Sequence, residues 1–182
     1  MAKQASGSGR ADRARGERHA AHLMFLLSAF CGFAVFTGGG HAPPALRTVQ
    51  SRARAVQDSL AIVAVAQGII AADNAKDLSR VLSYYADSAV LLPPNEGPVV
   101  GRAAIRPRYE RLFGEFDPAI VGAIDELVVG PEWAYVRGRN RRVLRRKAGG
   151  PDRVLNDIYI MLLRREGVGQ WRISRLMWHA GA

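Results

Sequence analysis

The chain has 182 residues, 48% of them apolar and 23% charged, and its 26 Lys and Arg against 16 Asp and Glu give a net charge of +10. These figures suit one domain with a tail and exclude a disordered chain, a collagen-like repeat and a small disulfide-stapled protein. Only one stretch is apolar enough to approach a bilayer, which excludes a polytopic membrane protein. An isoelectric point near 10.8 suggests a nucleic-acid partner, so the position of the charges matters.

Residues 1–42 have the composition of a signal peptide. Five basic residues precede an uncharged, largely apolar block over residues 20–36, and the small Gly40 and Ala42 precede a cleavage position. The alternatives are a membrane anchor over residues 20–37 and a mis-assigned start codon. The only cysteine, Cys31, follows the bulky Phe30, which argues against a lipoprotein signal. We therefore expect a periplasmic or secreted protein whose mature part has no thiol or disulfide.

After a linker over residues 43–50, the patterns predict three helices and one short strand. Apolar residues recur with a helical period, and Asp77 is expected to cap the second helix. The short strand ends at two prolines. The predicted helices are Ser51–Ala75, Leu78–Tyr85 and Arg102–Phe116, and the strand is Ala89–Leu92.

The last third of the chain changes to the two-residue period of strands. Four strands separated by short glycine-containing turns predict an antiparallel meander. Helices followed by such a meander favour an α+β domain over residues 51–182, with the helices on one face of the sheet. The predicted strands are 120–129, 132–146, 153–165 and 171–179.

Several motifs carry a family resemblance. They are Lys76-Asp77-Leu78, Tyr85-Ala86-Asp87-Ser88-Ala89-Val90, Gly101-Arg102-Ala103-Ala104-Ile105-Arg106, Trp133-Ala134-Tyr135-Val136-Arg137-Gly138 and Trp171-Arg172-Ile173. With these motifs the chain resembles the SnoaL-like, nuclear-transport-factor-2-like superfamily, of the SgcJ/EcaC type. The resemblance implies a cone-shaped, cystatin-like fold in which a strongly bent antiparallel sheet wraps three N-terminal helices. It also implies a pocket inside the sheet and a homodimer.

The resemblance does not fix an activity, because the same shell serves isomerases, cyclases, dehydratases, hydrolases and binding modules. Ketosteroid isomerases of this superfamily use a carboxylate base, a phenol and a protonated carboxyl. Alignment with their pattern places Pro93, Ile69 and Met161 at these three positions. None of these side chains can transfer a proton or donate a hydrogen bond, so the sequence argues against that reaction.

Asp157 and Tyr159 share one face of the third predicted strand. A carboxylate inside an apolar sheet is a candidate base, with a raised pKa if it is desolvated. Tyr159 or Tyr135 is then the expected hydrogen-bond donor, and Arg175 the charge partner. The alternative for Asp157 is an ion pair with a neighbouring arginine. Asp87 is expected to be a turn residue rather than a pocket carboxylate.

Aromatic and apolar residues supply a candidate ligand pocket. Trp133, Tyr135 and Arg137 alternate onto one face of a strand, where they either line the pocket or pack in the core. The expected pocket residues are Tyr85, Leu92, Tyr109, Trp133, Tyr135, Arg137 and Trp178. Three of the four histidines lie in residues 1–42, and no cluster has metal-ligand spacing, so we expect neither a metal nor another cofactor.

Seven basic residues fall within the eleven positions from Arg137 to Lys147. Removing residues 1–42 removes five basic and two acidic residues and leaves a net charge of +7, which this hairpin matches. An anionic lipid or polymer surface is one candidate partner, and a solvated strand edge is the alternative. Stacking aromatics do not interleave with the arginines, which argues against nucleic acid.

The sequence thus predicts an exported domain that binds a small, largely apolar molecule. The alternative is an isomerase, cyclase or dehydratase with Asp157 as base. The orientation of Asp157 is the discriminating observation, since a catalytic carboxylate has to face the pocket with Trp133 and Tyr135, rather than solvent or Arg153.

Overall fold

The structure, a computed structural model, describes residues 44–180, and the predicted signal peptide therefore lies outside the described residues. The described residues belong to one compact unit. Its helices are α1 (Pro44–Asn74), α2 (Leu78–Ser83) and α3 (Arg102–Glu115). Its strands are β1 (Tyr85–Leu92), β2 (Val99–Val100), β3 (Phe116–Val129), β4 (Trp133–Arg146), β5 (Arg153–Gly167) and β6 (Gln170–Ala180).

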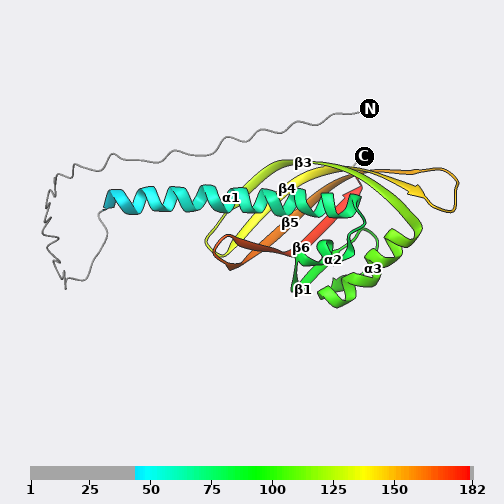
Figure 1. The fold of residues 1–182 in the computed structure, drawn as a ribbon, viewed down its shortest axis with the longest axis horizontal. Coiled ribbons are helices and arrows are strands. Elements are labelled where there is room, and N and C mark those ends of the chain that lie inside the picture. Colours follow the sequence, from blue (N-terminus) through cyan, green and yellow to red (C-terminus); the bar gives the residue numbers. More distant parts are fainter. Residues whose placement is uncertain (1–43, 181–182) are drawn as a thin grey trace, which may run out of the picture. The chain divides into compact units, whose positions relative to one another are not determined.

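The strands form one bent sheet in the order β2-β1-β6-β5-β4-β3, and the helices lie along one of its faces (Figure 1). The predicted α+β, cystatin-like fold is confirmed. The meander from β3 to β6 is antiparallel, as predicted, but β1 pairs in parallel with β6, so the sheet is mixed. This pairing joins strands distant in sequence, and the periodicity of the individual strands carries no signal for it.

Several boundaries differ from the prediction, and β3 begins at Phe116 rather than at residue 120. Helix α1 begins at Pro44, so most of the segment expected as a linker over residues 43–50 is helical. Proline suits the first helical position, because its missing N–H has no helical acceptor there. Strand β1 begins at Tyr85 rather than Ala89, and the short helix before it ends at Ser83. Asp77 caps that helix as predicted, by accepting a hydrogen bond from the Arg80 backbone N–H at 2.9 Å.

The hydrophobic core lies between the helices and the inner face of the sheet. Its fully buried members include Ile62 of α1, Tyr85 of β1, Ile105 of α3 and Leu163 of β5. Each helix therefore contributes one apolar side to the same core, which fixes the space left between helices and sheet.

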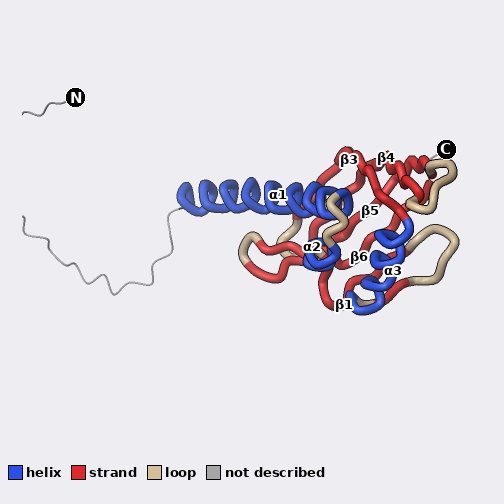
Figure 2. The backbone as a smooth tube through the Cα atoms, turned by 45° about the vertical axis from the view of Figure 1, so that its right-hand side comes forward, coloured by secondary structure: helices blue, strands red, loops and turns tan. Residues whose placement is uncertain are grey.

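The first half of α1 projects beyond the sheet (Figures 1 and 2). Residues 45–57 are all exposed, and burial begins at Asp58. The carboxylate of Asp58 accepts two hydrogen bonds from the Arg165 guanidinium of β5, each at 2.7 Å. This buried pair marks the point at which α1 joins the domain.

Helix α1 is also long and apolar enough to cross a membrane, by length and composition, over Ala45–Asn74. A third of its most apolar window is buried inside the domain. A long apolar helix near the N-terminus is compatible with a signal or anchor role for this end of the chain.

Candidate functional site

A cavity of about 400 Å³, partly open to solvent, lies between α1, α3 and the inner face of the sheet. Its walls are mostly apolar, with Ile69 of α1, Met161 of β5, and Leu176 and Trp178 of β6 among them. The two positions that match the phenol and second carboxyl of ketosteroid isomerases, Ile69 and Met161, are therefore apolar wall residues. Nine of the 22 residues that line the cavity are polar or charged, and they determine what it can bind.

Asp73, in the last turn of α1, is the most unusual of these polar groups. Its Oδ1 atom is buried and has no hydrogen-bond partner. Burial raises the pKa of the Asp73 carboxyl from 3.8 to about 7, although the nearby Arg142 guanidinium opposes this rise. A carboxyl of this kind changes charge near neutral pH.

Asn140 of β4 is the second group with an unpaired oxygen. Its Oδ1 atom is buried and lacks a hydrogen-bond partner, as in Asp73. A Cβ atom on Gly122 would lie 2.4 Å from this Oδ1 and 2.5 Å from Cδ1 of Ile70. The Asn140 amide therefore reaches α1 one turn before Asp73, at the same side of the cavity.

Asp157 lines the cavity, but it is ion-paired with Arg142, which donates to its Oδ2 through Nε. The register pairs Asn140 with Asp157, so Arg142 is the diagonal neighbour on the same face of the sheet. Asp157 thus faces neither solvent nor Arg153, and its charge is matched by Arg142.

Two tyrosine groups border the cavity. Tyr109 of α3 lies in its wall, and its hydroxyl is 2.9 Å from that of Tyr85, which is fully buried behind it. Burial raises the pKa of both phenols. Tyr159 lies in the wall opposite Gly138, where a Cβ atom would approach the Tyr159 hydroxyl to 2.5 Å. The missing side chain at residue 138 makes room for the Tyr159 ring.

Four of the predicted site residues line this cavity, namely Tyr109, Asp157, Tyr159 and Trp178. Trp133, Tyr135 and Arg137 instead lie on the outer face of the sheet. Residues alternate between faces along a strand, and in β4 the even-numbered positions face the cavity. The prediction had identified the strand and its alternation but had assigned the cavity to the opposite face.

The remaining predicted site residues do not lie in the wall of the cavity. Arg175 of β6 is exposed and donates to the backbone oxygen and hydroxyl of Ser174. On β1, Leu91 rather than Leu92 reaches the cavity, and Tyr85 lies behind Tyr109. Asp87, predicted in a turn, instead lies within β1, where it is exposed and ion-paired with Arg102 of α3.

Asp73, Asn140 and Arg142 were not among the predicted site residues. A signal for Asp73 exists, because it follows Ala66 and Ile69 at helical spacing on the buried side of α1. For Asn140 and Arg142 the only signal in the sequence is that both occupy even-numbered positions of β4. Within residues 44–180, no three His, Cys, Asp or Glu side chains are grouped so as to hold a metal ion.

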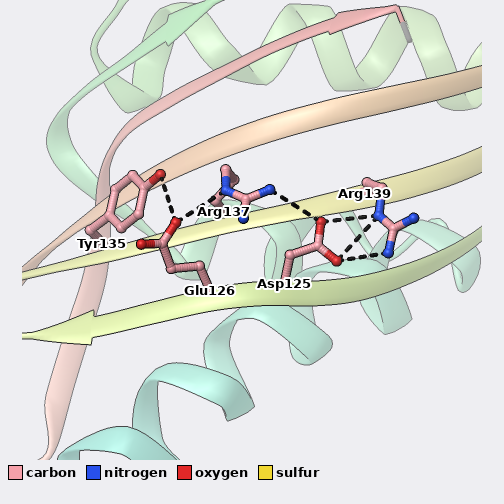
Figure 3. Close-up of polar contacts among 5 residues, drawn as sticks. All are labelled: Asp125, Glu126, Tyr135, Arg137 and Arg139. Atoms are coloured by element: carbon pink, nitrogen blue, oxygen red, sulfur yellow. Dashed lines mark hydrogen bonds and ion pairs between the residues drawn. The ribbon is translucent and has the colours of Figure 1, made fainter. Parts of the chain in front are cut away.

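Much of the basic run on β4 is paired with carboxylates. Arg137 and Arg139 both contact Asp125, and Arg137 also contacts Glu126 (Figure 3). A register shift between Ile124 and Glu126 inserts Asp125 as an extra residue in β3. The bulge allows two successive acidic side chains to reach the same face.

The other end of the run is partly paired too. Arg142 contacts Asp157 and Arg145 contacts Asp152 at 3.9 Å. Four of the seven basic residues between Arg137 and Lys147 thus have acidic partners, which reduces the positive field of this hairpin.

Comparison with known proteins shows which family this fold resembles. The model of the SnoaL-like domain matches residues 66–172, which include β1 to β5 and the first three residues of β6. A search of curated proteins finds no match to the sequence.

Solved structures share the fold. A ketosteroid isomerase-like protein from Erwinia carotovora atroseptica is 26% identical, with 68% of this chain and 95% of that one covered and a TM-score of 0.62. A conserved protein from Planctomyces limnophilus is 23% identical over 68% and 98% of the two chains, with a TM-score of 0.64. An NTF2-like protein with a cystatin-like fold from Novosphingobium aromaticivorans is 15% identical over 76% and 92%, with a TM-score of 0.61.

Proposed function

Since this chain belongs to the SnoaL-like domain family, we propose that it is an exported domain that binds a small, largely apolar molecule in the cavity between α1, α3 and the sheet. The observation that carries the proposal is the cavity itself, about 400 Å³ in volume, in which 13 of the 22 lining residues are apolar or aromatic. Such a composition is typical of small-molecule sites, where apolar walls supply affinity and isolated polar groups supply orientation.

A cavity-filling variant with a neighbouring control tests this function. Leu176 lines the cavity, whereas the next residue, Met177, is 42% exposed on the other face of β6. Leu176→Trp is expected to abolish binding of 2-methoxynaphthalene, used as an apolar probe in calorimetry of the full chain, while Met177→Trp leaves it unchanged. Equal binding to both variants would overturn the proposal.

Acid–base catalysis is the second candidate function, favoured by one observation. Asp73 is an unpaired carboxyl in the cavity with a pKa of about 7, which suits a group that takes up and returns protons at neutral pH. The isomerase, cyclase or dehydratase chemistry considered for Asp157 is therefore better assigned to Asp73. A substrate turned over by this enzyme would show a rate that depends on pH near 7, and Asp73→Asn would abolish turnover while retaining binding.

Export is supported by the sequence of residues 1–42, in which basic residues precede an apolar block and small residues at Gly40 and Ala42. Mass spectrometry of the chain recovered from its cell would find a mature N-terminus at Pro43. An intact N-terminus in the membrane fraction would favour the anchor, and an intact chain in the cytoplasm would contradict export.

A homodimer through the outer face of the sheet is the arrangement that we propose for assembly. Val128, Tyr135 and Leu162 form one row across β3, β4 and β5, and Val128 is 54% exposed. Exposed apolar residues in such a row are typical of protein–protein contacts. Leu162→Glu is expected to give a monomer in light scattering, and Val168→Glu, in the exposed turn between β5 and β6, is the matched control. A dimeric Leu162→Glu variant would exclude this surface.

A further inference from the structure

Four exposed apolar side chains lie along one side of α1. They are Leu46, Val49, Val56 and Leu60, each between 54% and 66% exposed. Single exposed apolar residues need no explanation, but these four follow one another at steps of three, seven and four residues. Ala53, also exposed, divides the step of seven into four and three. We call these five residues the α1 stripe.

The α1 stripe points away from the domain. Leu60 belongs to it, whereas Ile62, two residues or about 200° further around the helix, is fully buried in the core. The first half of α1 also projects beyond the sheet (Figure 2). A second element can therefore lie along the stripe without displacing any residue of the core.

The spacing of the α1 stripe favours another helix as that element. Steps of alternately three and four residues place two apolar positions in every seven, which is the narrow seam of a coiled coil. A helix that lies on a membrane surface has a wider apolar face, commonly with aromatic residues. Residues 44–63 contain no Phe, Tyr or Trp. From Leu46 to Leu60 the seam is about 20 Å long, so it suits a partner helix of about 15 residues.

The charge of this half of α1 indicates the charge of the partner. Residues 44–57 contain Arg47, Arg52 and Arg54 and no acidic residue. Arg52 directly precedes Ala53 and flanks the stripe, at a position whose charge selects the partner in coiled coils. The other two arginines add to the positive potential around it. A second copy of this segment would bring an equal positive charge, whereas an acidic helix is complementary.

The exposed half of α1 is ordered before a partner binds. An isolated helix of about 14 residues is marginally stable in water, but this one continues a helix whose second half is fixed in the domain. Asp58 holds it to Arg165 of β5, and Ile62 packs in the core. Binding to such a preformed surface loses less conformational entropy than binding to a flexible segment.

From these observations we propose that the exposed half of α1 is a docking site for an acidic amphipathic helix of another protein. The partner helix packs its apolar seam on the α1 stripe and places a carboxylate beside Arg52. No residue of the stripe lines the cavity, so this site is distinct from the one that binds a small molecule.

Two synthetic peptides of about three heptads test the charge of the partner in calorimetry with the full chain. Both carry Val and Leu at the seam, and the flanking positions are Glu in the acidic peptide and Lys in the basic one. The acidic peptide is expected to bind about fivefold more tightly, because an exposed ion pair in one complex and a repulsion in the other differ by about this factor. Arg52→Gln should remove most of this preference. Arg141→Gln, the same change at an exposed position of β4, should preserve it.

A second pair of variants tests the α1 stripe itself. Val49→Glu places a charge in the seam and should weaken binding of the acidic peptide by about tenfold or more. Ser51→Glu introduces the same charge two residues later, on the side of the helix that Asp58 occupies seven residues further on, and should weaken binding by less than about threefold. Both positions are exposed, so neither change affects the core.

Four outcomes would overturn the inference. Equal binding of the two peptides would show that charge does not select the partner, and equal effects of Val49→Glu and Ser51→Glu would show that the stripe is not the contact. A lower molar mass in light scattering for Val49→Glu alone would assign the stripe to a second copy of the chain. If neither peptide binds and Val49→Glu alone reduces sedimentation with phosphatidylglycerol vesicles, the stripe contacts a membrane instead.

Discussion

Asp58 and Arg165, 107 positions apart in sequence, form a buried ion pair in which both carboxylate oxygens lie 2.7 Å from guanidinium nitrogens. The Trp171 indole donates to Asp58 Oδ1 at 3.2 Å, and the Arg165 guanidinium lies 4.3 Å from the centre of the Trp171 ring. The hydrogen bonds from Arg165 are the main cause that lowers the pKa of Asp58. Three elements, α1, β5 and β6, are joined at this one place.

Removing one partner of this pair should be costly. Asp58→Ala leaves the Arg165 guanidinium buried without its carboxylate, which typically costs about 3–5 kcal/mol. We expect a loss of this size in urea denaturation of the full chain. Glu166→Ala, which removes the surface ion pair with Arg172, is the control and should cost less than about 1 kcal/mol. Similar losses in both variants would contradict the anchoring role of Asp58.

The stability of the fold should decrease between about pH 4 and pH 7 through Asp73. The unfolded carboxyl releases its proton near 3.8, whereas the folded one holds it to about 7, so the folded state binds more protons in this window. The free energy of unfolding contributed by Asp73 is therefore fully present below the unfolded pKa and is lost as the pH rises through the folded pKa. The size of this loss is of the order of 4 kcal/mol.

The neutral variant Asp73→Asn isolates this effect. Its unfolding free energy should lack the Asp73 contribution to the pH slope, so that it matches the original chain near pH 4 and exceeds it at pH 8. Parallel stability curves for the two chains would show that Asp73 is ionised in the folded state throughout this range.

Gly138 should tolerate no side chain. A Cβ atom at this position would lie 2.3 Å from the Ala123 backbone oxygen and 2.5 Å from the Tyr159 hydroxyl, so Gly138→Ala has to displace either the β3–β4 pairing or the cavity wall. We expect destabilisation by about 1–3 kcal/mol, as for other overpacked sites. Gly114→Ala meets no atom within 4 Å in α3 and should instead stabilise the protein, by about 0.5–1 kcal/mol. Thermal denaturation measures both.

Removing Asp125 should increase the affinity of the chain for anionic surfaces. Its carboxylate contacts both Arg137 and Arg139, and the hydrogen bonds from Arg139 are the main cause that lowers its pKa. Asp125→Asn leaves Arg139 without its carboxylate and Arg137 with Glu126 alone, and retention on heparin should then extend to higher salt. Asp87→Asn, a change of the same charge at the Arg102 pair on β1, should have a smaller effect. Equal shifts would indicate that only net charge matters.

Most of the fold could be predicted from the sequence, because the sequence patterns that indicate helices and strands are local. Periodicity located the helices and the long strands, and Asp77 was identified as a cap from its residue type and position. The parallel pairing of β1 with β6 was not accessible, since it depends on contacts between distant segments. The helical start at Pro44 was missed because the segment after it is polar enough to resemble a linker.

The candidate site was predicted less well, and the reason is geometrical. Alternation on β4 was identified correctly, yet sequence does not say which face of a strand is concave, and Trp133 and Tyr135 were assigned to the wrong side. Asp157 was found, but its partner Arg142 depends on strand register. Asp73 was missed because a single acidic residue near a helix end is ordinarily solvated, and only the tertiary structure buries it.

Helix α1 is uninterrupted from Pro44 to Asn74, and it therefore also acts as a spacer of defined length. At about 1.5 Å per residue, the 29 steps from Pro44 to Asp73 correspond to roughly 40 Å. A flexible segment would leave the distance between residue 44 and the domain undefined, whereas this helix holds the cavity at a set distance from residue 44. Shortening the exposed part of α1 by whole turns would bring the cavity closer in steps of about 5 Å without altering any residue that lines it.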